Sequence, residues 1–208
     1  FTINVVDTNA AATGAMVYDY LKEYREKPLS KNICEGIYTA VMTDTGSFRY
    51  SNTNTKCHEI AIECLNAGVE TSKIYQRIYE TKPQSSIRLL ARVIENISFE
   101  NDGELAWFSI DQNMLDAAEA SSKDVDGFTD FIRTIKGVEV AVMVFENGRD
   151  VCRINFRSQG KYVINDIAKH FGGGGHKFAA GAVIKGNKET IVPQVISQTI
   201  ASLERQAA

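Results

Sequence analysis

Four consecutive glycines followed by a histidine form the segment of this chain that is most suited to binding an anion. The run is Gly172–Gly175, and His176 follows it directly. Glycine allows positive φ angles and lets a ligand lie against the backbone, while histidine can donate a hydrogen bond, accept one or carry charge. A glycine run is also typical of the loop that ends a helix, so both interpretations stay open. The spacing fits neither a Walker A loop nor a G-x-G-x-x-G loop.

The segment upstream of the glycines is predicted to be a strand with arginines on one face. Residues 150–157 alternate between apolar side chains and Arg153, Asn155 and Arg157, which is the period of a half-buried strand. Arginine can hold a phosphate through two parallel N–H groups, although a solvated face explains the same pattern. Since one predicted helix separates this strand from His176, we expect the arginines and the Gly–His segment to form one compact phosphate site.

A single carboxylate marks the end of a predicted helix in the segment Thr43–Arg49. Asp44 could ligate a metal, because carboxylates suit Mn²⁺ and Mg²⁺, or it could cap the turn that follows. One carboxylate does not make a metal site, so the sequence leaves both interpretations open. Arg49 is either a surface charge or a second phosphate contact.

The composition is that of an ordinary globular protein. The 208 residues are 44% hydrophobic and 24% charged, with a net charge of −3. That balance argues against a broad electrostatic surface for nucleic acids, but it leaves room for a small anion held by a few local cations. The sequence shows neither a membrane-length apolar run nor a signal peptide. Its four cysteines lack metal-binding spacing, so Cys57, Cys64 and Cys152 are expected in the core of a reduced, cytoplasmic protein.

The periodicity of apolar residues predicts an α/β protein that is helical in its first part and rich in strands after the turn Glu100–Gly103. Expected helices lie around residues 16–24, 33–41, 57–65, 72–80 and 85–97, and then at 112–120, 127–135, 163–171 and 190–205. Expected strands lie at 1–6, 105–110, 138–146, 150–157 and near 182–184, with Asn147-Gly148 as a hairpin turn. The chain starts at Phe1 with a strand that lacks neighbours, so we expect a fragment of a longer protein.

The motifs of the second half together closely resemble the DHHA1 domain of DHH-family phosphoesterases. They are Arg157-Ser158 on a strand, Asn165-Asp166-Ile167-Ala168, Phe171-Gly172-Gly173-Gly174-Gly175-His176 and Ala179-Ala180-Gly181. In the first half, Thr43–Arg49 is similar to the last motif of the DHH catalytic domain, and Thr13-Gly14 is similar to the stretch after the DHH signature. Within the family, the chain resembles the bifunctional oligoribonucleases and pAp phosphatases, which are the nanoRNase type.

The resemblance implies an α/β chain that joins the C-terminal portion of a DHH catalytic domain to a DHHA1 substrate-binding domain. The first part is expected at residues 1–84, a helical linker at 85–103 and the DHHA1 domain at 104–208. It further implies an enzyme that hydrolyses short oligoribonucleotides, 3′-phosphoadenosine 5′-phosphate or both. In this family the attacking water is activated by two metal ions, usually Mn²⁺, with Mg²⁺ as an alternative.

The resemblance also assigns roles to residues of this chain. It makes Asp44 a catalytic metal ligand and makes several residues of the second domain contacts for the terminal phosphate and nucleotide. These substrate contacts are Arg157, Ser158, Gly174, Gly175 and His176. Strand geometry adds Arg153 to them, and Arg49 is a further candidate. A clamp on a non-reacting phosphate favours short substrates, because its binding energy positions the scissile bond.

The sequence departs from the family at the metal ligands. The Asp-His-His motif is absent, and no two histidines are adjacent. Asp44 alone cannot hold two metal ions, so the complete protein is expected to be the enzyme and this chain by itself to be inactive. Two alternatives stay open: a non-catalytic nucleotide-binding module, and a cyclic-dinucleotide phosphodiesterase or polyphosphatase of the same superfamily. No membrane contact is expected, and a homodimer is left open.

Overall fold

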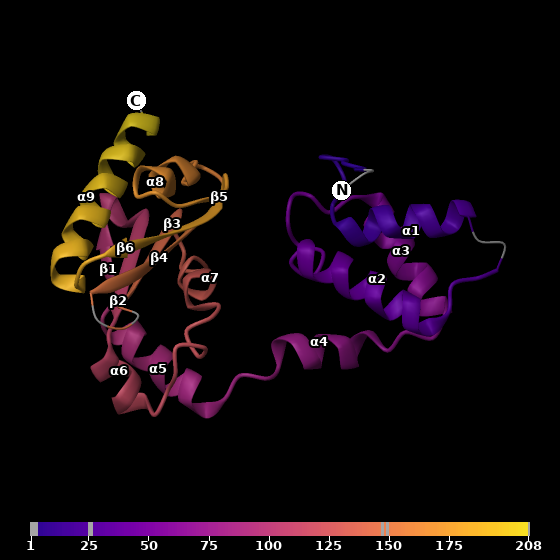
Figure 1. The fold of residues 1–208 in the computed structure, drawn as a ribbon, viewed down its shortest axis with the longest axis horizontal. Helices are drawn as coiled ribbons and strands as arrows, with labels where there is room; N and C mark the ends of the chain where they lie inside the picture. The colour runs from indigo at the N-terminus through magenta and orange to yellow at the C-terminus, as the bar shows by residue number, and fades with distance from the viewer. Residues whose placement is uncertain (1–3, 25–26, 147, 149, 208) are drawn as a thin grey trace. The chain divides into compact units, whose positions relative to one another are not determined.

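The computed structural model describes residues 4–24, 27–146, 148 and 150–207, which fold into two compact units. The first unit is Phe1–Thr81 and the second is Lys82–Ala208. Figure 1 labels the helices and strands of both units along the chain. Each unit buries a hydrophobic interior of its own.

The regular elements described in the first unit are helices. They are α1 (Thr13–Tyr24), α2 (Lys31–Asp44), α3 (Thr55–Asn66) and α4 (Thr71–Tyr79). Gly14 lets α1 approach α2 closely, because a Cβ at this position would lie 2.6 Å from the Cβ of Ala40. Asn54 is the N-cap of α3, since its side-chain oxygen accepts a hydrogen bond from the Cys57 amide at 3.2 Å.

Helices α2 and α3 enclose a core that contains several thiols. Cys34, Cys57 and Cys64 are free and buried beside apolar residues such as Val41 and Ile60. Burial raises the pKa of the Cys64 thiol to about 12, so this thiol stays protonated near neutral pH and is a poor nucleophile. The prediction that Cys57 and Cys64 serve as small buried hydrophobes is confirmed.

A hydrogen-bonded carboxylate links α1 to α3. The Tyr18 hydroxyl donates to Glu63 at 2.6 Å, and the Lys22 ammonium donates to the same carboxylate at 3.0 Å. Burial, together with this bond, raises the pKa of Tyr18. The bond from Tyr18, more than the nearby Lys22, holds the pKa of Glu63 below its usual range. Glu63 is therefore kept ionised between the two helices.

The strand predicted at the start of the chain is wrong for the residues that the structure describes. Residues 4–7 have no regular structure, and Val5 and Val6 are exposed. Residues 1–3 lie outside the described part of the chain. A strand needs a partner for its backbone N–H and C=O groups, and the described residues of the first unit include no strand that could provide one.

A six-stranded sheet forms the centre of the second unit. Its strands are β1 (Ser98–Glu100), β2 (Leu105–Ile110), β3 (Val140–Glu146), β4 (Val151–Ser158), β5 (Gly174–His176) and β6 (Ala179–Lys185). Their order across the sheet is β1-β2-β3-β4-β6-β5. Strands β2 and β3 pair in parallel, and the other described pairs are antiparallel. A parallel pair requires a crossover connection, which here contains helices α6 and α7.

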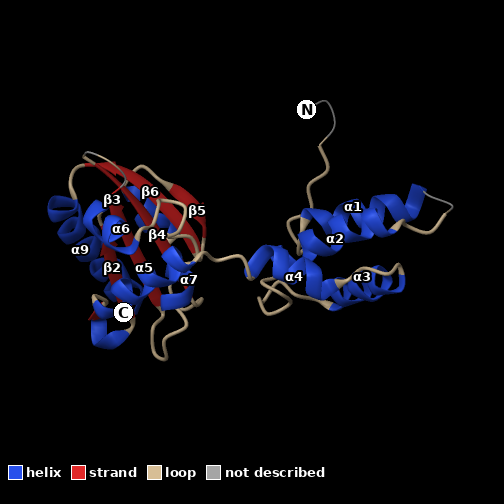
Figure 2. Ribbon diagram, turned by 90° about the horizontal axis from the view of Figure 1, so that it is seen from below, coloured by secondary structure: helices blue, strands red, loops and turns tan. Residues whose placement is uncertain are grey.

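Helices pack on both faces of this sheet, as Figure 2 shows. Helices α5 (Gln84–Glu95), α6 (Gln112–Ala118) and α7 (Phe128–Ile132) cover one face, and α8 (Asn165–His170) and α9 (Lys188–Ala207) cover the other. The short 3-10 helix η1 (Asn101–Gly103) connects β1 to β2. The α/β fold class that the sequence predicts is confirmed.

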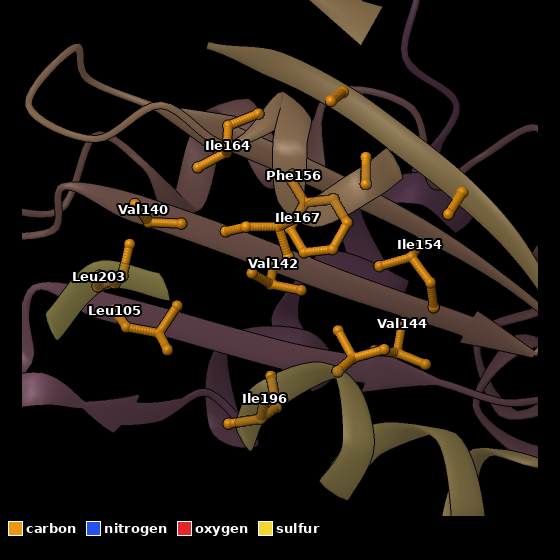
Figure 3. Packing of buried hydrophobic residues seen from close by; sticks show 14 of the residues in the cluster. Leu105, Val140, Val142, Val144, Ile154, Phe156, Ile164, Ile167, Ile196 and Leu203 are labelled. Carbon is orange, nitrogen blue, oxygen red and sulfur yellow. The ribbon is translucent and has the colours of Figure 1, made fainter. Parts of the chain in front are cut away.

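Alternation along β4 separates its apolar residues from its arginines. Cys152, Ile154 and Phe156 are fully buried in the core beneath α8 and α9, and Figure 3 shows this packing around Ile154 and Phe156. Because successive side chains of a strand point to opposite faces, Arg153 and Arg157 point to the face that carries α7. The predicted half-buried strand is confirmed, with Cys152 in the core.

Two short edge strands differ from the sequence prediction. Strands β1 and β5 each contain three residues, which is too few for alternation to be recognised. Strand β1 lies inside segment 85–103, for which the family resemblance predicts a helical linker. Helix α5, in the same segment, contributes Leu89 and Val93 to the core of the second unit.

We expect the Glu63→Gln substitution to destabilise the first unit in a pH-dependent way. A carboxylate whose pKa is lowered by folding stabilises the protein fully above its ordinary pKa of 4.5 and loses this effect as the pH falls through the folded value. The loss in unfolding free energy should be about 1 kcal/mol at neutral pH and should shrink between about pH 5 and pH 3. Urea denaturation at several pH values measures it.

Glu35→Gln is the matched control for this prediction. Glu35 lies 3.9 Å from Lys31 in an exposed ion pair, and such pairs contribute little. An equal loss of stability for Glu63→Gln at pH 3 and at pH 7 would contradict the ionised Glu63 network.

Candidate anion-binding site

The first two glycines of the run end helix α8. Gly172 has a φ of 73°, a left-handed conformation that glycine adopts without strain. The Gly172 amide donates to the carbonyl oxygen of Lys169 at 2.9 Å, and the Gly173 amide donates to that of Ala168 at 2.8 Å. This pair of hydrogen bonds is a Schellman motif, so the helix-ending interpretation holds for this half of the run.

The last two glycines belong to the edge strand β5. Gly175 pairs with Ala180, and His176 pairs with Ala179. A Cβ on Gly173 would lie 2.1 Å from a carbonyl oxygen of β6, and a Cβ on Gly175 would lie 2.5 Å from another. Side chains at these two positions are therefore incompatible with the close approach of β5 to β6.

The register of the sheet places His176 on the same face as the arginines. Arg157 pairs with Ala179, which pairs in turn with His176, and directly opposite residues share a face. Neighbouring strands lie about 4.8 Å apart, so the Cα atoms of Arg157 and His176 are about 10 Å apart. Both side chains can therefore reach a group of the size of a phosphate that lies between them.

Small residues line the sheet between the side chains of Arg157 and His176. Ala179 separates them, and the adjacent row of the sheet is formed by Asn155, Gly181 and Gly174. A Cβ on Gly174 would meet no atom within 4 Å, which shows that the surface above it is open. We call this surface, with Arg153, Arg157 and His176, the arginine face.

Arg157 is held by a carboxylate from α7. Its Nε donates to the two carboxylate oxygens of Asp130 at 3.1 and 3.3 Å, and its Nη1 donates to the carbonyl oxygen of Phe156 at 3.1 Å. The side chain keeps 30% of its surface exposed. A ligand in solution can therefore reach the guanidinium.

Arg153 lies nearer the start of β4, and two of its buried nitrogens have no hydrogen-bond partner among the described residues. Its guanidinium lies over the ring of Phe145 at 5.5 Å from the centroid, and Nη2 is 3.7 Å from a carboxylate oxygen of Asp126. Within the described part of the chain, Nε and Nη2 have no hydrogen-bond partner. Buried donors are rarely left unsatisfied in proteins, so these two favour an acceptor from water or a ligand.

Ser158 points away from the arginine face. Its side chain is buried on the opposite face of the sheet, where Oγ accepts a hydrogen bond from the Gly160 amide at 3.1 Å. Its own amide donates to the carbonyl oxygen of Phe178 at 3.0 Å. The structure thus places the Ser158 hydroxyl in the turn after β4 rather than beside Arg157.

In the first unit, the segment after α2 has a strained backbone. Gly46, Ser47 and Phe48 have φ angles of 55°, 60° and 63°, and left-handed angles are unfavourable for residues with large side chains. The buried Thr45 hydroxyl secures the turn by donating to the Val41 carbonyl oxygen at 2.6 Å and accepting from the Phe48 amide at 3.1 Å. Such strain is typical of functional segments.

Asp44 and Arg49 flank this strained turn. Asp44 is exposed, and its backbone carbonyl oxygen accepts a hydrogen bond from the Asn52 side chain at 3.1 Å. Nε of Arg49 donates to the carbonyl oxygen of Gly46 at 2.8 Å. Both side chains belong to the first unit, whereas the arginine face belongs to the second.

The described residues supply one candidate metal ligand rather than a metal centre. Among them, no group of three or more His, Cys, Asp or Glu side chains is arranged to hold an ion. They therefore do not fit the two-ion centre that the family resemblance implies. Asp44 by itself provides no metal-dependent step.

Two contacts of the candidate residues are not predictable from the sequence. Asp130 binds Arg157 although the two are 27 positions apart. His58, to which the sequence gave no role, stacks on Phe48 with ring centroids 5.3 Å apart. Each contact joins two separate elements, so a signal for it exists only once the packing of those elements is known.

A groove on the opposite face of the sheet does not suit an anion. It has a volume of about 530 Å³ and is lined mainly by apolar residues of β2 and α9, among them Trp107 and Ile196. The ionisable residues of its lining are Glu100 and Glu204, which repel negative charge. The arginine face is therefore the better candidate for a phosphate.

The arginine face lies within a segment that matches a known domain family. Residues 110–202 match the DHHA1 domain, and this segment contains α7, the four strands β3 to β6 and α8. Together with relatives that match most of the chain, this match supports a protein of the DHH/DHHA1 type.

Within this family, the chain is similar to proteins of the nanoRNase type, as its motifs predict. The bifunctional oligoribonuclease and PAP phosphatase NrnA of Thermus thermophilus is 32% identical over 184 residues, which are 88% of this chain and 54% of the relative. The protein of the same name from Bacillus subtilis is 30% identical over 181 residues, covering 86% and 56%. The chain spans about half the length of these relatives.

A solved structure supports the family fold. An exopolyphosphatase-related protein from Bacteroides fragilis superposes with a TM-score of 0.88 at 28% sequence identity. The match covers 98% of this chain and 59% of that protein. The DHH-family fold that the motifs predict is thereby confirmed.

We expect Gly175→Ala to destabilise the second unit by about 1–3 kcal/mol, because its Cβ would collide with β6 at a positive φ angle. Gly174→Ala is the matched control in the same strand, since its Cβ would meet open space, and its effect should stay within about 0.5 kcal/mol. Urea denaturation of both variants measures the difference. Equal stabilities of the two variants would contradict the observed pairing of β5 with β6.

Proposed function

We propose that the complete protein is a metal-dependent phosphoesterase and that the second unit of this chain binds the phosphate end of its substrate. The placement of Arg157 and His176 on one open sheet face carries this proposal. A guanidinium binds phosphate oxygens through charge-assisted hydrogen bonds, and an imidazole N–H can donate to them as well. Relatives named oligoribonuclease and PAP phosphatase support it.

The proposed substrates are short oligoribonucleotides, 3′-phosphoadenosine 5′-phosphate (pAp), or both. Arg157 and His176 would contact a terminal phosphate, and the partly exposed guanidinium of Arg153 would attract a further anionic group of the substrate. The open surface above Gly174 leaves room for a nucleotide to lie against the backbone. These contacts involve parts of the substrate that do not react, so their binding energy can position the scissile bond.

We propose that Asp44 is one ligand of the metal centre, with Mn²⁺ as the ion and Mg²⁺ as the alternative. Its exposed carboxylate beside a strained turn supports this role, and carboxylates suit both ions. The other ligands would come from outside the described residues, so this chain alone is proposed to be inactive. Arg49 is proposed as a substrate contact of the first unit.

A second candidate function is the hydrolysis of polyphosphate. The likeness to the exopolyphosphatase-related protein of Bacteroides fragilis favours it, and the arginine face would suit a chain of phosphates as well as a nucleotide. Polyphosphate has no base, however, so the open glycine surface would contribute little to its binding. Comparison of the two substrate classes therefore separates the two functions.

The proposed setting is the reducing cytoplasm. The four cysteines are free and buried, which suits a compartment where thiols stay reduced. In the described ranges, no helix is both long enough and apolar enough to cross a membrane. A homodimer stays a prediction that sedimentation of the complete protein tests.

We expect Arg157→Ala and His176→Ala each to weaken the binding of pAp, because each removes a charged hydrogen bond to phosphate. The loss of roughly 1.5–3 kcal/mol of binding free energy corresponds to an increase in Kd of about tenfold to a hundredfold. Calorimetric titration of the chain with pAp measures it. Arg88→Ala, which removes an exposed arginine paired with Glu119 at 2.9 Å, should leave the Kd unchanged. An unchanged Kd for Arg157→Ala would overturn the proposed site.

We expect Asp44→Ala to abolish metal-dependent turnover in the protein expressed from the complete reading frame while leaving the binding of pAp intact. The carboxylate is proposed to hold the ion rather than the terminal phosphate. Turnover is measured on pAp, a diribonucleotide and polyphosphate with added Mn²⁺. Preferred turnover of polyphosphate would favour the second candidate function, and full activity of Asp44→Ala would exclude this residue as a ligand.

A further inference from the structure

We propose that Asp130 is a positioning residue that holds the guanidinium of Arg157 in the orientation that binds phosphate. The inference rests on the proposed phosphate-binding role of Arg157 and deepens it. Arginine loses much rotamer freedom when it binds a ligand. A carboxylate that orders the side chain beforehand reduces this cost of binding.

The contact leaves one edge of the guanidinium free. Asp130 accepts from Nε of Arg157 at 3.1 and 3.3 Å, and the Phe156 carbonyl oxygen accepts from Nη1 at 3.1 Å. Within the described part of the chain, no protein acceptor bonds to Nη2. The carboxylate thus fixes the Nε end of the guanidinium. Nη2 and the second N–H of Nη1 stay available to a phosphate.

A second arginine balances the charge of Asp130. Nη2 of Arg133 lies 3.9 Å from the same carboxylate. Arg133 is fixed in turn by Gln159, which accepts from its Nη1 at 3.2 Å and donates to its carbonyl oxygen at 2.7 Å. Two guanidinium groups and one carboxylate carry a net charge of +1, so the ordered arginine still attracts an anion.

The helix that carries Asp130 is anchored in the core. Phe128 and Ile132, on either side of Asp130 in α7, are buried. The helix begins after Gly127, whose φ of 85° is left-handed and whose carbonyl oxygen accepts from the Phe131 amide at 2.9 Å. The carboxylate is therefore presented from a fixed element, which is what a positioning residue requires.

The geometry shows that Asp130 can orient Arg157 without competing with phosphate for it. A carboxylate that competed with phosphate would bind the Nη1–Nη2 edge, which offers two parallel donors. Asp130 instead binds Nε, so ligand and carboxylate can be bound at the same time. Removing Asp130 should therefore weaken the binding of an anion rather than strengthen it.

A double-mutant cycle with pAp as the probe tests the proposal on the chain of 208 residues. Asp130→Asn should raise the Kd about tenfold in the wild-type background and change it less than about twofold in the Arg157→Ala background, because the residue acts through Arg157. Glu119→Gln, which disrupts the exposed pair with Arg88, is the matched control and should leave the Kd unchanged. Tighter binding by Asp130→Asn, or equal losses in both backgrounds, would overturn the proposal.

A second measurement tests the positioning role of Asp130 independently of pAp binding. The NMR signal of the Arg157 Nε–H group in the free protein should exchange slowly with solvent, because the proton is bonded to a carboxylate. The exchange should become fast in Asp130→Asn and stay slow in Glu119→Gln. If the wild-type chain binds no pAp, the proposed function fails, while this signal still shows whether Asp130 orders the guanidinium. Fast exchange in the wild-type chain would refute the positioning role.

Discussion

The close approach of β5 to β6 is the constraint on which the candidate site depends. The backbone of β6 occupies the space where side chains of Gly173 and Gly175 would lie, so any other residue at these positions would push the edge strand away. The preceding Gly172 ends α8 in a left-handed conformation and turns the chain directly into this strand. His176 therefore lies opposite Ala179, and β6 is the strand that separates it from Arg157 in β4.

The chemistry of the arginine face follows from where the helices of the second unit lie. Helices α8 and α9 bury the apolar side of β4, so both of its arginines must be accommodated on the other side. There α7 supplies Asp130 to Arg157, and the loop before it supplies Asp126 to Arg153. Because Arg133 also contacts Asp130, the positive charge is reduced but not cancelled. Ordered arginines on an open surface of small residues are well suited to a compact anion.

The sequence predicted long elements well, and contacts between elements poorly. The helical period identified α5 and α9, and the period of two identified β4, because each repeats over several residues. Strand β5 was missed because three residues show no period. In the structure, alternation along β4 puts Arg153 and Arg157 on one face and the buried Ser158 side chain on the opposite face. The family motif had nevertheless selected Ser158 as a substrate contact.

By itself, the sequence determined the α/β class, the family and the face of β4 that carries arginines, because periodicity, glycine runs and motifs are local properties of the chain. Only the tertiary structure decided that His176 shares this face, since the answer depends on the register of three strands. It also decided that Asp130 is the partner of Arg157. That contact joins elements that are distant in the sequence, and no spacing rule relates them. Local patterns select the residues that can bind an anion, whereas packing decides which of them lie side by side.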